Sequence, residues 1–239
     1  MRHRNDIYGD DIDRREADNP AIAAATVVLL REVPEPQVLL LHKTSKIAFG
    51  GMWVFPGGRV DPQDHPADGN ADAAARNAAV RETQEETGIT ASPDEFVWFS
   101  HWTPPPSTPK RFATWFFAAR VDDHEVNVDG GEIQNHQWLA PAAALEQHAA
   151  GRIDLAPPTW VTLFHLSRHG DVDSLLAHLR TTPTRFYATH LAKRRDGTRV
   201  AMWHGDAGYA AWDADAPGER HRLVMSKDGF IFENTVEVY

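Results

Sequence analysis

The chain has 239 residues, of which 42% are hydrophobic and 24% charged, with a formal net charge of −10 and no cysteine. This composition is typical of a globular protein and excludes a disordered, collagen-like or fibrous chain. The negative charge disfavours DNA as a partner, and the absence of cysteine excludes disulfides, zinc–thiolate sites and thiol catalysis. The longest apolar run, Ala21 to Leu30, falls short of the ~20 residues of a membrane span. No secretory signal is visible, and we expect no membrane partner and a cytoplasmic location.

The N-terminal third of the chain is predicted to start with a tail and a β-hairpin. Residues 1–20 lack an apolar stretch and are expected to be mobile. Two apolar runs, 23–30 and 37–42, flank Val-Pro-Glu-Pro, which predicts two strands joined by a rigid loop. A short strand over 52–55 is expected to end at Pro56-Gly57-Gly58, and the polar residues 59–70 are expected to form a loop.

A helix is predicted next, over residues 72–87. Asp72 suits its N-cap, and Gly88 suits the position that follows its last turn. The same reasoning predicts the remaining elements, which are strands over 96–102, 111–121, 199–203, 221–225 and 230–232 and a strand that closes at Trp138-Leu139, a proline loop over 104–109, and helices over 141–150, 159–168 and 173–180. No Gly/Ser linker separates the C-terminal part, so we expect it to pack on the rest.

The segment Arg81-Glu-Thr-Gln-Glu-Glu-Thr-Gly-Ile89 is the strongest chemical signal. On a helix, Glu82, Glu85 and Glu86 stand at i, i+3 and i+4, so their carboxylates project from one face. Such a cluster favours a divalent cation with hard oxygen ligands, Mg²⁺ or Mn²⁺. Arg81 lies four residues before Glu85 and can pair with it, and the turn at Gly57 can direct backbone carbonyls at the cation. The alternative is a solvated acidic helix face.

Together with the preceding Phe55-Pro-Gly-Gly58, this segment resembles the Nudix box, G-x5-E-x7-R-E-U-x-E-E-x-G-U, where U is apolar. The matched positions are Gly58, Arg81, Glu82, Glu85, Glu86, Gly88 and Ile89. Thr83 replaces the apolar residue, and 22 residues separate Gly58 from Arg81 where the pattern has 13. This insertion leaves the first Glu of the box without a clear equivalent, and Asp64 and Asp72 are the two candidates.

The resemblance implies an α/β Nudix fold, with a mixed β-sheet sandwiched between helices, over residues 21–151 and a C-terminal α+β extension over 152–239. It implies metal ligation by the Gly57 carbonyl, Glu82, Glu85, Glu86 and Glu132, and catalytic roles for Glu85, Glu132 and Arg81. Glu132 stands six residues before Trp138-Leu139 and is a metal ligand or the base that activates water, the alternative being a glutamate at a loop edge. Which carboxylate is the base stays open.

Four further segments resemble the Nudix subgroup that contains the peroxisomal coenzyme A diphosphatase, namely 47–61, 109–117, 155–159 and 204–209. Members of that subgroup also carry an insertion in the box and a C-terminal extension. The resemblance implies Mg²⁺-dependent cleavage of coenzyme A or an acyl-coenzyme A to 3′,5′-ADP and (acyl-)phosphopantetheine. Arg59, Lys110 and Arg111 are candidate contacts for a substrate phosphate, and a surface pair is the alternative for the last two.

Two other readings of the function stay open. The substrate could be ADP-ribose or another dinucleotide, or the chain could bind a nucleotide without cleaving it. Many members of the family dimerise, so a homodimer is an alternative to a monomer.

Overall fold

The computed structural model describes residues 8, 19–44, 50–122, 125–128 and 130–236. The strands are β1 (Ile22–Glu32), β2 (Pro36–Lys43), β3 (Trp53–Val54), β4 (Gly57–Arg59), β5 (Val97–Thr103), β6 (Phe112–Arg120), β7 (Ile133–Leu139), β8 (Arg185–Ala188), β9 (His190–Lys193), β10 (Arg199–Met202), β11 (His221–Ser226) and β12 (Gly229–Asn234). The α-helices are α1 (Ala71–Thr87), α2 (Pro141–Ala149), α3 (Pro157–Leu166) and α4 (Val172–Thr181). In the described part of the chain, no helix is long and apolar enough to cross a membrane.

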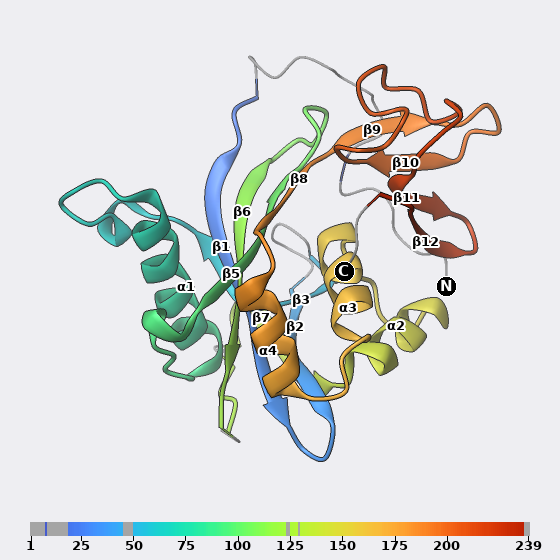
Figure 1. The fold of residues 1–239 in the computed structure, drawn as a ribbon. Coiled ribbons are helices and arrows are strands. Elements are labelled where there is room, and N and C mark those ends of the chain that lie inside the picture. Colours follow the sequence, from blue (N-terminus) through green and yellow to red (C-terminus); the bar gives the residue numbers. More distant parts are fainter. Residues whose placement is uncertain (1–7, 9–18, 45–49, 123–124, 129, 237–239) are drawn as a thin grey trace.

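The main sheet is mixed, as predicted (Figure 1). Its order is β3-β2-β1-β6-β5-β8, with β4 paired to β1 and β7 paired to β2. The hairpin of β1 and β2 is antiparallel, whereas β1 and β6 run parallel over nine residue pairs. Strand β1 is central because its residues are apolar on both faces, which is what a strand covered on both sides requires.

Helices cover both faces of this sheet. Alternate residues of β1 divide between two apolar clusters, with Val27 and Leu29 facing α1 and Val28 and Leu30 facing the layer of α3 and α4. Helix α1 approaches the sheet closely because the residues it buries against it are alanines. The predicted α/β class, a mixed sheet between helices, is confirmed.

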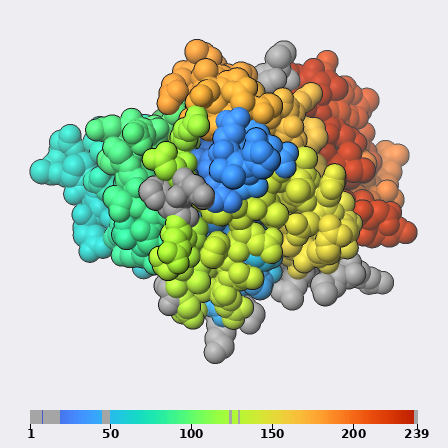
Figure 2. Space-filling model, turned by 90° about the horizontal axis from the view of Figure 1, so that it is seen from below, coloured from blue at the N-terminus to red at the C-terminus, as the bar shows by residue number. Residues whose placement is uncertain are grey.

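The residues that we assigned to an extension complete the fold. Helices α3 and α4 form the second helical layer, and β8 joins the main sheet beside β5 in parallel pairing. Strands β9 to β12 form a separate antiparallel sheet. Figure 2 shows the red C-terminal residues beside the yellow helical segments, at the end of the molecule away from the teal helix α1.

A buried ion pair holds the second sheet together. Asp206 and Arg222 have fully buried side chains, and Arg222 Nε donates to Asp206 Oδ2 over 2.6 Å. The same carboxylate accepts hydrogen bonds from the backbone N–H groups of Gly208 and His221. Burial raises the pKa of Asp206, but the bonds from Arg222 outweigh it and the pKa lies below its ordinary value. This carboxylate is therefore charged and fully partnered.

We expect Asp206→Asn to lower the free energy of unfolding by about 3–5 kcal/mol, because it leaves the Arg222 guanidinium buried without its counter-ion. Asp173→Asn is the control, since Asp173 pairs with Arg120 on the surface and is 83% exposed; such a pair contributes about 1 kcal/mol or less. Urea denaturation of both variants measures the difference. Equal stabilities for the two variants would contradict the structural role of Asp206.

Several sequence predictions need correction. The N-cap of α1 is Asn70, whose side chain accepts a hydrogen bond from Ala73 N, and not Asp72. Residues 57–59, expected as a turn and loop, form the short strand β4, and strands β8 and β9 were not predicted. Of the predicted mobile tail, Tyr8 is only 2% exposed and packs in the core, whereas residues 1–7 and 9–18 lie outside the described residues.

Candidate active site

Helix α1 positions the predicted acidic residues at the edge of the sheet. It is rich in alanine, which has the highest helix propensity. It ends at Gly88, whose φ of 73° lies in the left-handed region that glycine adopts without strain. Its C-terminal half carries Glu82, Glu85 and Glu86, and the carboxylates of Glu82 and Glu86 lie against Gly58 and Gly57.

Glu86 is the most deeply buried of the three carboxylates, with a side chain that is 7% exposed. Its Oε2 accepts a hydrogen bond from the N–H of Gly57 over 2.9 Å, and its Oε1 lies 3.2 Å from Lys43 Nζ. Burial raises the pKa of Glu86 to about 7, and Lys43 and Gly57 act in the opposite direction. It is the N–H of Gly57 that the structure places against α1, where the sequence prediction invoked its carbonyl.

The two glycines of this segment allow the close approach. A Cβ on Gly58 would lie 2.3 Å from Glu82 Oε1, so a side chain here would displace that carboxylate. A Cβ on Gly57 would lie 2.3 Å from the carbonyl oxygen of Ala25, and the φ of Gly57 is 152°. Glycine is therefore required at position 57 by the backbone of β1, and at position 58 by the carboxylate of Glu82.

Arg81 is the centre of an ion-pair network. Its guanidinium donates to both carboxylate oxygens of Asp64, over 3.0 and 2.9 Å, and to Glu82 Oε1 over 2.9 Å. It also donates to Glu85 Oε2 over 3.2 Å, as the sequence predicted, and to the carbonyl of Arg59. The hydrogen bonds that Arg81 donates to the carboxylates of Asp64 and Glu82 raise the pKa of Arg81 further above its ordinary value.

Asp64, which lies in the inserted loop, forms an ion pair with Arg81. It stands at the end of a short 3₁₀ turn, Pro62–Asp64, and is only 4% exposed. Burial raises its pKa, but the bonds from Arg81 outweigh that effect and the pKa is lowered overall. Asp72 instead forms a surface pair with Arg76 one turn along the helix. Of the two candidates for the first acidic position of the box, Asp64 is thus the one that contacts Arg81.

A cavity of about 1100 Å³ lies in front of these residues. Its lining includes the predicted site residues Gly57, Arg59, Arg81, Glu82, Glu85, Glu86 and Glu132, together with Lys43 and Asp61. Residues from β2, β4, α1 and the segment before β7 thus face one space, although they are far apart in the sequence. A large cavity with several convergent polar groups is the usual form of a ligand-binding site.

These donors fit a divalent cation in chemistry, since carboxylate oxygens are the ligands that Mg²⁺ and Mn²⁺ prefer. The raised pKa of Glu86 shows a buried carboxylate whose charge a cation would stabilise. Within the described residues, no three Asp, Glu or His side chains already converge as a complete ligand set. The reason is visible in the network, because Glu82 and Glu85 both turn to Arg81.

The predicted substrate contacts divide into two groups. Arg59 and Lys110 line the cavity, whereas Arg111 does not. Arg111 is 4% exposed and donates to the backbone carbonyls of Pro104 and Asn19 over 2.7–3.1 Å. The expectation that Arg111 meets a substrate phosphate is therefore wrong in this structure, because its donors are used to hold the proline loop.

Sequence reasoning missed Lys43 and the hydroxyl-bearing wall of the cavity. Lys43 is the last residue of the apolar strand β2. A single cationic residue at the end of an apolar strand is the only local sequence feature that could have indicated a functional role for it. Thr108, Thr159 and Thr189 line the same cavity from three separate segments. Nothing in their neighbouring residues distinguishes them from ordinary surface threonines, so only the tertiary fold identifies them.

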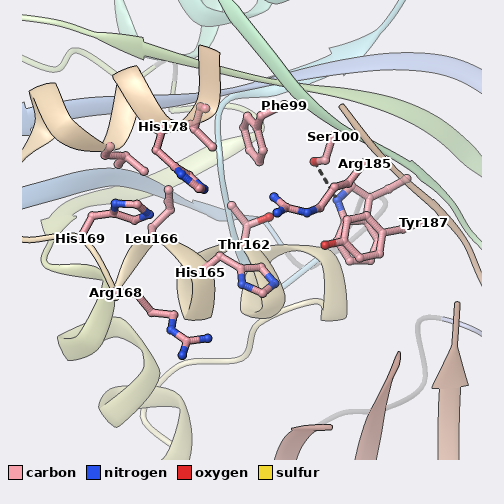
Figure 3. A pocket seen from close by; sticks show the side chains of 13 residues that line it. Phe99, Ser100, Thr162, His165, Leu166, Arg168, His169, His178, Arg185 and Tyr187 are labelled. Carbon is pink, nitrogen blue, oxygen red and sulfur yellow. Dashed lines mark hydrogen bonds between the residues drawn. The ribbon is translucent and has the colours of Figure 1, made fainter. Parts of the chain in front are cut away.

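A second, much smaller cavity of about 30 Å³ lies among α3, α4 and β8 (Figure 3). His165, His169 and His178 line it, and burial lowers the pKa of His165 to about 2, so that this imidazole is neutral near pH 7. None of the predicted site residues and no carboxylate is among the described residues that line it. Its volume is about that of one water molecule, which is too small for a nucleotide.

Comparison with known proteins gives consistent matches. The family model described as NUDIX domain matches residues 20–158. The CTP pyrophosphohydrolase of Escherichia coli is 30% identical over 110 residues, which cover 46% of this chain and 71% of that protein. A Caenorhabditis elegans protein named as nudix hydrolase 7 is 25% identical over 187 residues, which cover 63% of this chain and 62% of that protein's length. The crystal structure of a NUDIX hydrolase from Alicyclobacillus acidocaldarius superposes with a TM-score of 0.61 at 23% identity, covering 70% of this chain and all of that one.

Proposed function

The chain belongs to the Nudix family and is a Nudix hydrolase, and we propose that it cleaves the diphosphate bond of coenzyme A or an acyl-coenzyme A with the help of Mg²⁺ or Mn²⁺. The observation that carries the proposal is a single cavity lined by Glu82, Glu85, Glu86 and Glu132, of which the Glu86 carboxylate is buried. The likeness of several segments to the coenzyme A diphosphatase subgroup supports the substrate.

In this reaction the oxygen of water forms a bond to one phosphorus, and the bridging P–O bond breaks. The bridging oxygen leaves with the other phosphate, so that the products are two phosphate monoesters, 3′,5′-ADP and phosphopantetheine. The proton that water loses passes to a carboxylate, and we assign this role to Glu132, which lines the same cavity as the carboxylates of α1. A divalent cation held by the carboxylates of α1 would neutralise charge on the diphosphate and lower the pKa of the attacking water.

The other residues would bind the cation, position its ligands or contact the substrate. Glu82, Glu85 and Glu86 are the proposed cation ligands. Arg81 is a positioning residue, because it contacts Glu82 and Glu85 while Asp64 fixes its guanidinium. Lys43 balances the charge of Glu86, and Arg59 and Lys110 stand where a phosphate group would pass.

The test incubates the purified protein with coenzyme A, acetyl-coenzyme A, ADP-ribose and CTP, each with Mg²⁺, and identifies the products by mass. We expect 3′,5′-ADP and (acyl-)phosphopantetheine from the first two. ADP-ribose is included because it is the main alternative, and CTP because the Escherichia coli relative is named for it. Cleavage of ADP-ribose or CTP alone would refute coenzyme A as the substrate. Turnover of none, with Mg²⁺ or Mn²⁺, would refute diphosphate hydrolysis of these compounds and favour a binding module.

A further inference from the structure

The acidic end of the large cavity contains a cationic side chain beside the proposed cation ligands. Lys43 lines this cavity, and its Nζ lies 3.2 Å from Glu86 Oε1. Both side chains are largely buried, with 12% of the Lys43 side chain and 7% of the Glu86 side chain exposed. Burial raises the pKa of Glu82, and the charges of Arg81 and Lys43 act in the opposite direction, so the charge of Lys43 affects this carboxylate as well. The carboxylates that we expect to hold a divalent cation therefore already have one positive charge among them.

The cationic side chains of this region divide the carboxylates between them. The guanidinium of Arg81 donates to Glu82 and Glu85, as described above. In the part of the chain that the structure describes, Lys43 is the only basic residue with a side-chain nitrogen within 4 Å of the Glu86 carboxylate. The counter-ion of Glu86 in this structure is therefore Lys43, whereas Arg81 neutralises the other two carboxylates of α1.

The backbone of Lys43 is fixed by its neighbours on both sides. Its N–H donates to the carbonyl of Met52, just before β3, over 3.0 Å. On the other side it pairs with Ile133 of β7, the residue that follows Glu132. The side chain of lysine, in contrast, is a flexible four-carbon stem that ends in a compact charge. The ammonium of Lys43 can therefore leave the Glu86 carboxylate without any movement of the sheet.

We propose that the Lys43 ammonium competes with the divalent cation for the Glu86 carboxylate and thereby lowers the affinity of the site for that cation. Two positive charges that share one buried carboxylate repel each other, and the repulsion is stronger than in water because the effective dielectric constant is lower. If Lys43 instead only kept Glu86 in place, its removal would weaken the binding of the cation. The inference rests on the proposed function, in which Glu86 is a cation ligand.

The experiment measures Mn²⁺ binding by electron paramagnetic resonance at pH 8, where the Glu86 carboxylate of the wild-type protein is charged. Lys43→Met and Lys43→Gln remove the positive charge and keep a side chain of similar length, whereas Lys43→Arg keeps the charge. We expect the two neutral variants to bind Mn²⁺ about tenfold more tightly than the wild-type protein, because the competing charge is gone. Lys43→Arg should bind Mn²⁺ within about threefold of the wild type. Melting temperatures verify that each variant is folded.

Lys110→Met is the matched control, because Lys110 lines the same cavity away from its acidic end. Thr26 of β1 pairs with Gly57 on one side and with Phe116 on the other, so that Phe116 is level with Gly57 in the sheet. Lys110 Nζ lies over the ring of Phe112, 5.2 Å from its centroid. Phe112 precedes Phe116 by four residues, which is about 13 Å along the strand. This variant should leave Mn²⁺ binding within about twofold of the wild type.

The outcomes separate the inference from the proposed function. Equal or weaker Mn²⁺ binding by the neutral Lys43 variants would overturn the inference, as would a tenfold gain in Lys43→Arg or Lys110→Met, or no Mn²⁺ binding by any of these proteins. Cleavage of coenzyme A by the wild-type protein is measured in parallel. If coenzyme A is cleaved while the neutral variants bind Mn²⁺ like the wild type, the inference alone fails. If they bind Mn²⁺ more tightly but coenzyme A is not cleaved, the proposed reaction alone fails.

Discussion

Glu86→Gln is expected to lower kcat by roughly 10³-fold, because a catalytic metal ion supplies several kcal/mol of transition-state stabilisation and its most buried ligand would be lost. The substitution keeps the size of the side chain, and the amide oxygen can still accept the hydrogen bond from Gly57 N. What changes is the negative charge opposite Lys43 and the cavity. Steady-state kinetics on the substrate that the wild-type protein cleaves provides the measurement.

Stability distinguishes this effect from misfolding. Because the pKa of Glu86 rises from 4.5 to about 7 on folding, the folded protein binds an extra proton in that interval. The stability of the metal-free wild type should therefore fall as the pH rises from 4.5 to about 7, and Glu86→Gln should lack this dependence. Glu146→Gln, on the exposed side of α2, is the control for both measurements. Retention of more than a tenth of the wild-type kcat by Glu86→Gln would contradict its role.

Asp64→Asn is expected to lower the free energy of unfolding by about 3 kcal/mol and to reduce kcat as well. Asp64 accepts two hydrogen bonds from Arg81 and one from the backbone N–H of Asp61. An amide in its place presents an NH₂ group to donors of the guanidinium. Arg81 would then lose the partner that fixes it, and the orientation of Glu82 and Glu85 would be lost with it.

Asp72→Asn is the matched control, because the two residues were equivalent candidates in the sequence. Asp72 pairs with Arg76 at the helix surface, and such a pair contributes roughly 0.5 kcal/mol. Denaturant unfolding and kcat are measured for both variants. A larger loss in Asp72→Asn than in Asp64→Asn would show that Asp64 does not replace the first acidic residue of the box.

Local signals in the sequence predicted the elements that carry the chemistry. The helix expected over 72–87 is observed over Ala71–Thr87, and the hairpin and its two strands are present. The spacing of Glu82, Glu85 and Glu86 placed them on one helix face, and they do line one cavity. These features could be predicted because they depend on residue periodicity and glycine positions within short stretches of the sequence.

Features that depend on distant residues could not be predicted. The partner of Arg81 lies in an inserted loop whose path no motif describes, and a 3₁₀ turn in that loop ends at Asp64. Strand β8 is only four residues long and pairs in parallel with β5, which lies more than 80 residues earlier in the chain. Arg111 looked like a phosphate contact beside Lys110, but the loop that it supports buries it. Lys43 is identified only by its contact with Glu86.

The central claim is that the carboxylates of α1 hold a divalent cation in the large cavity. Titration of the metal-free protein with Mn²⁺, followed by electron paramagnetic resonance, tests this claim directly and needs no substrate. We expect the wild-type protein to bind Mn²⁺ and Mg²⁺ to compete for the site. Glu86→Gln should weaken Mn²⁺ binding at least about tenfold, whereas Glu146→Gln should leave it unchanged. Equal Mn²⁺ binding by the wild-type protein and by Glu86→Gln would contradict it.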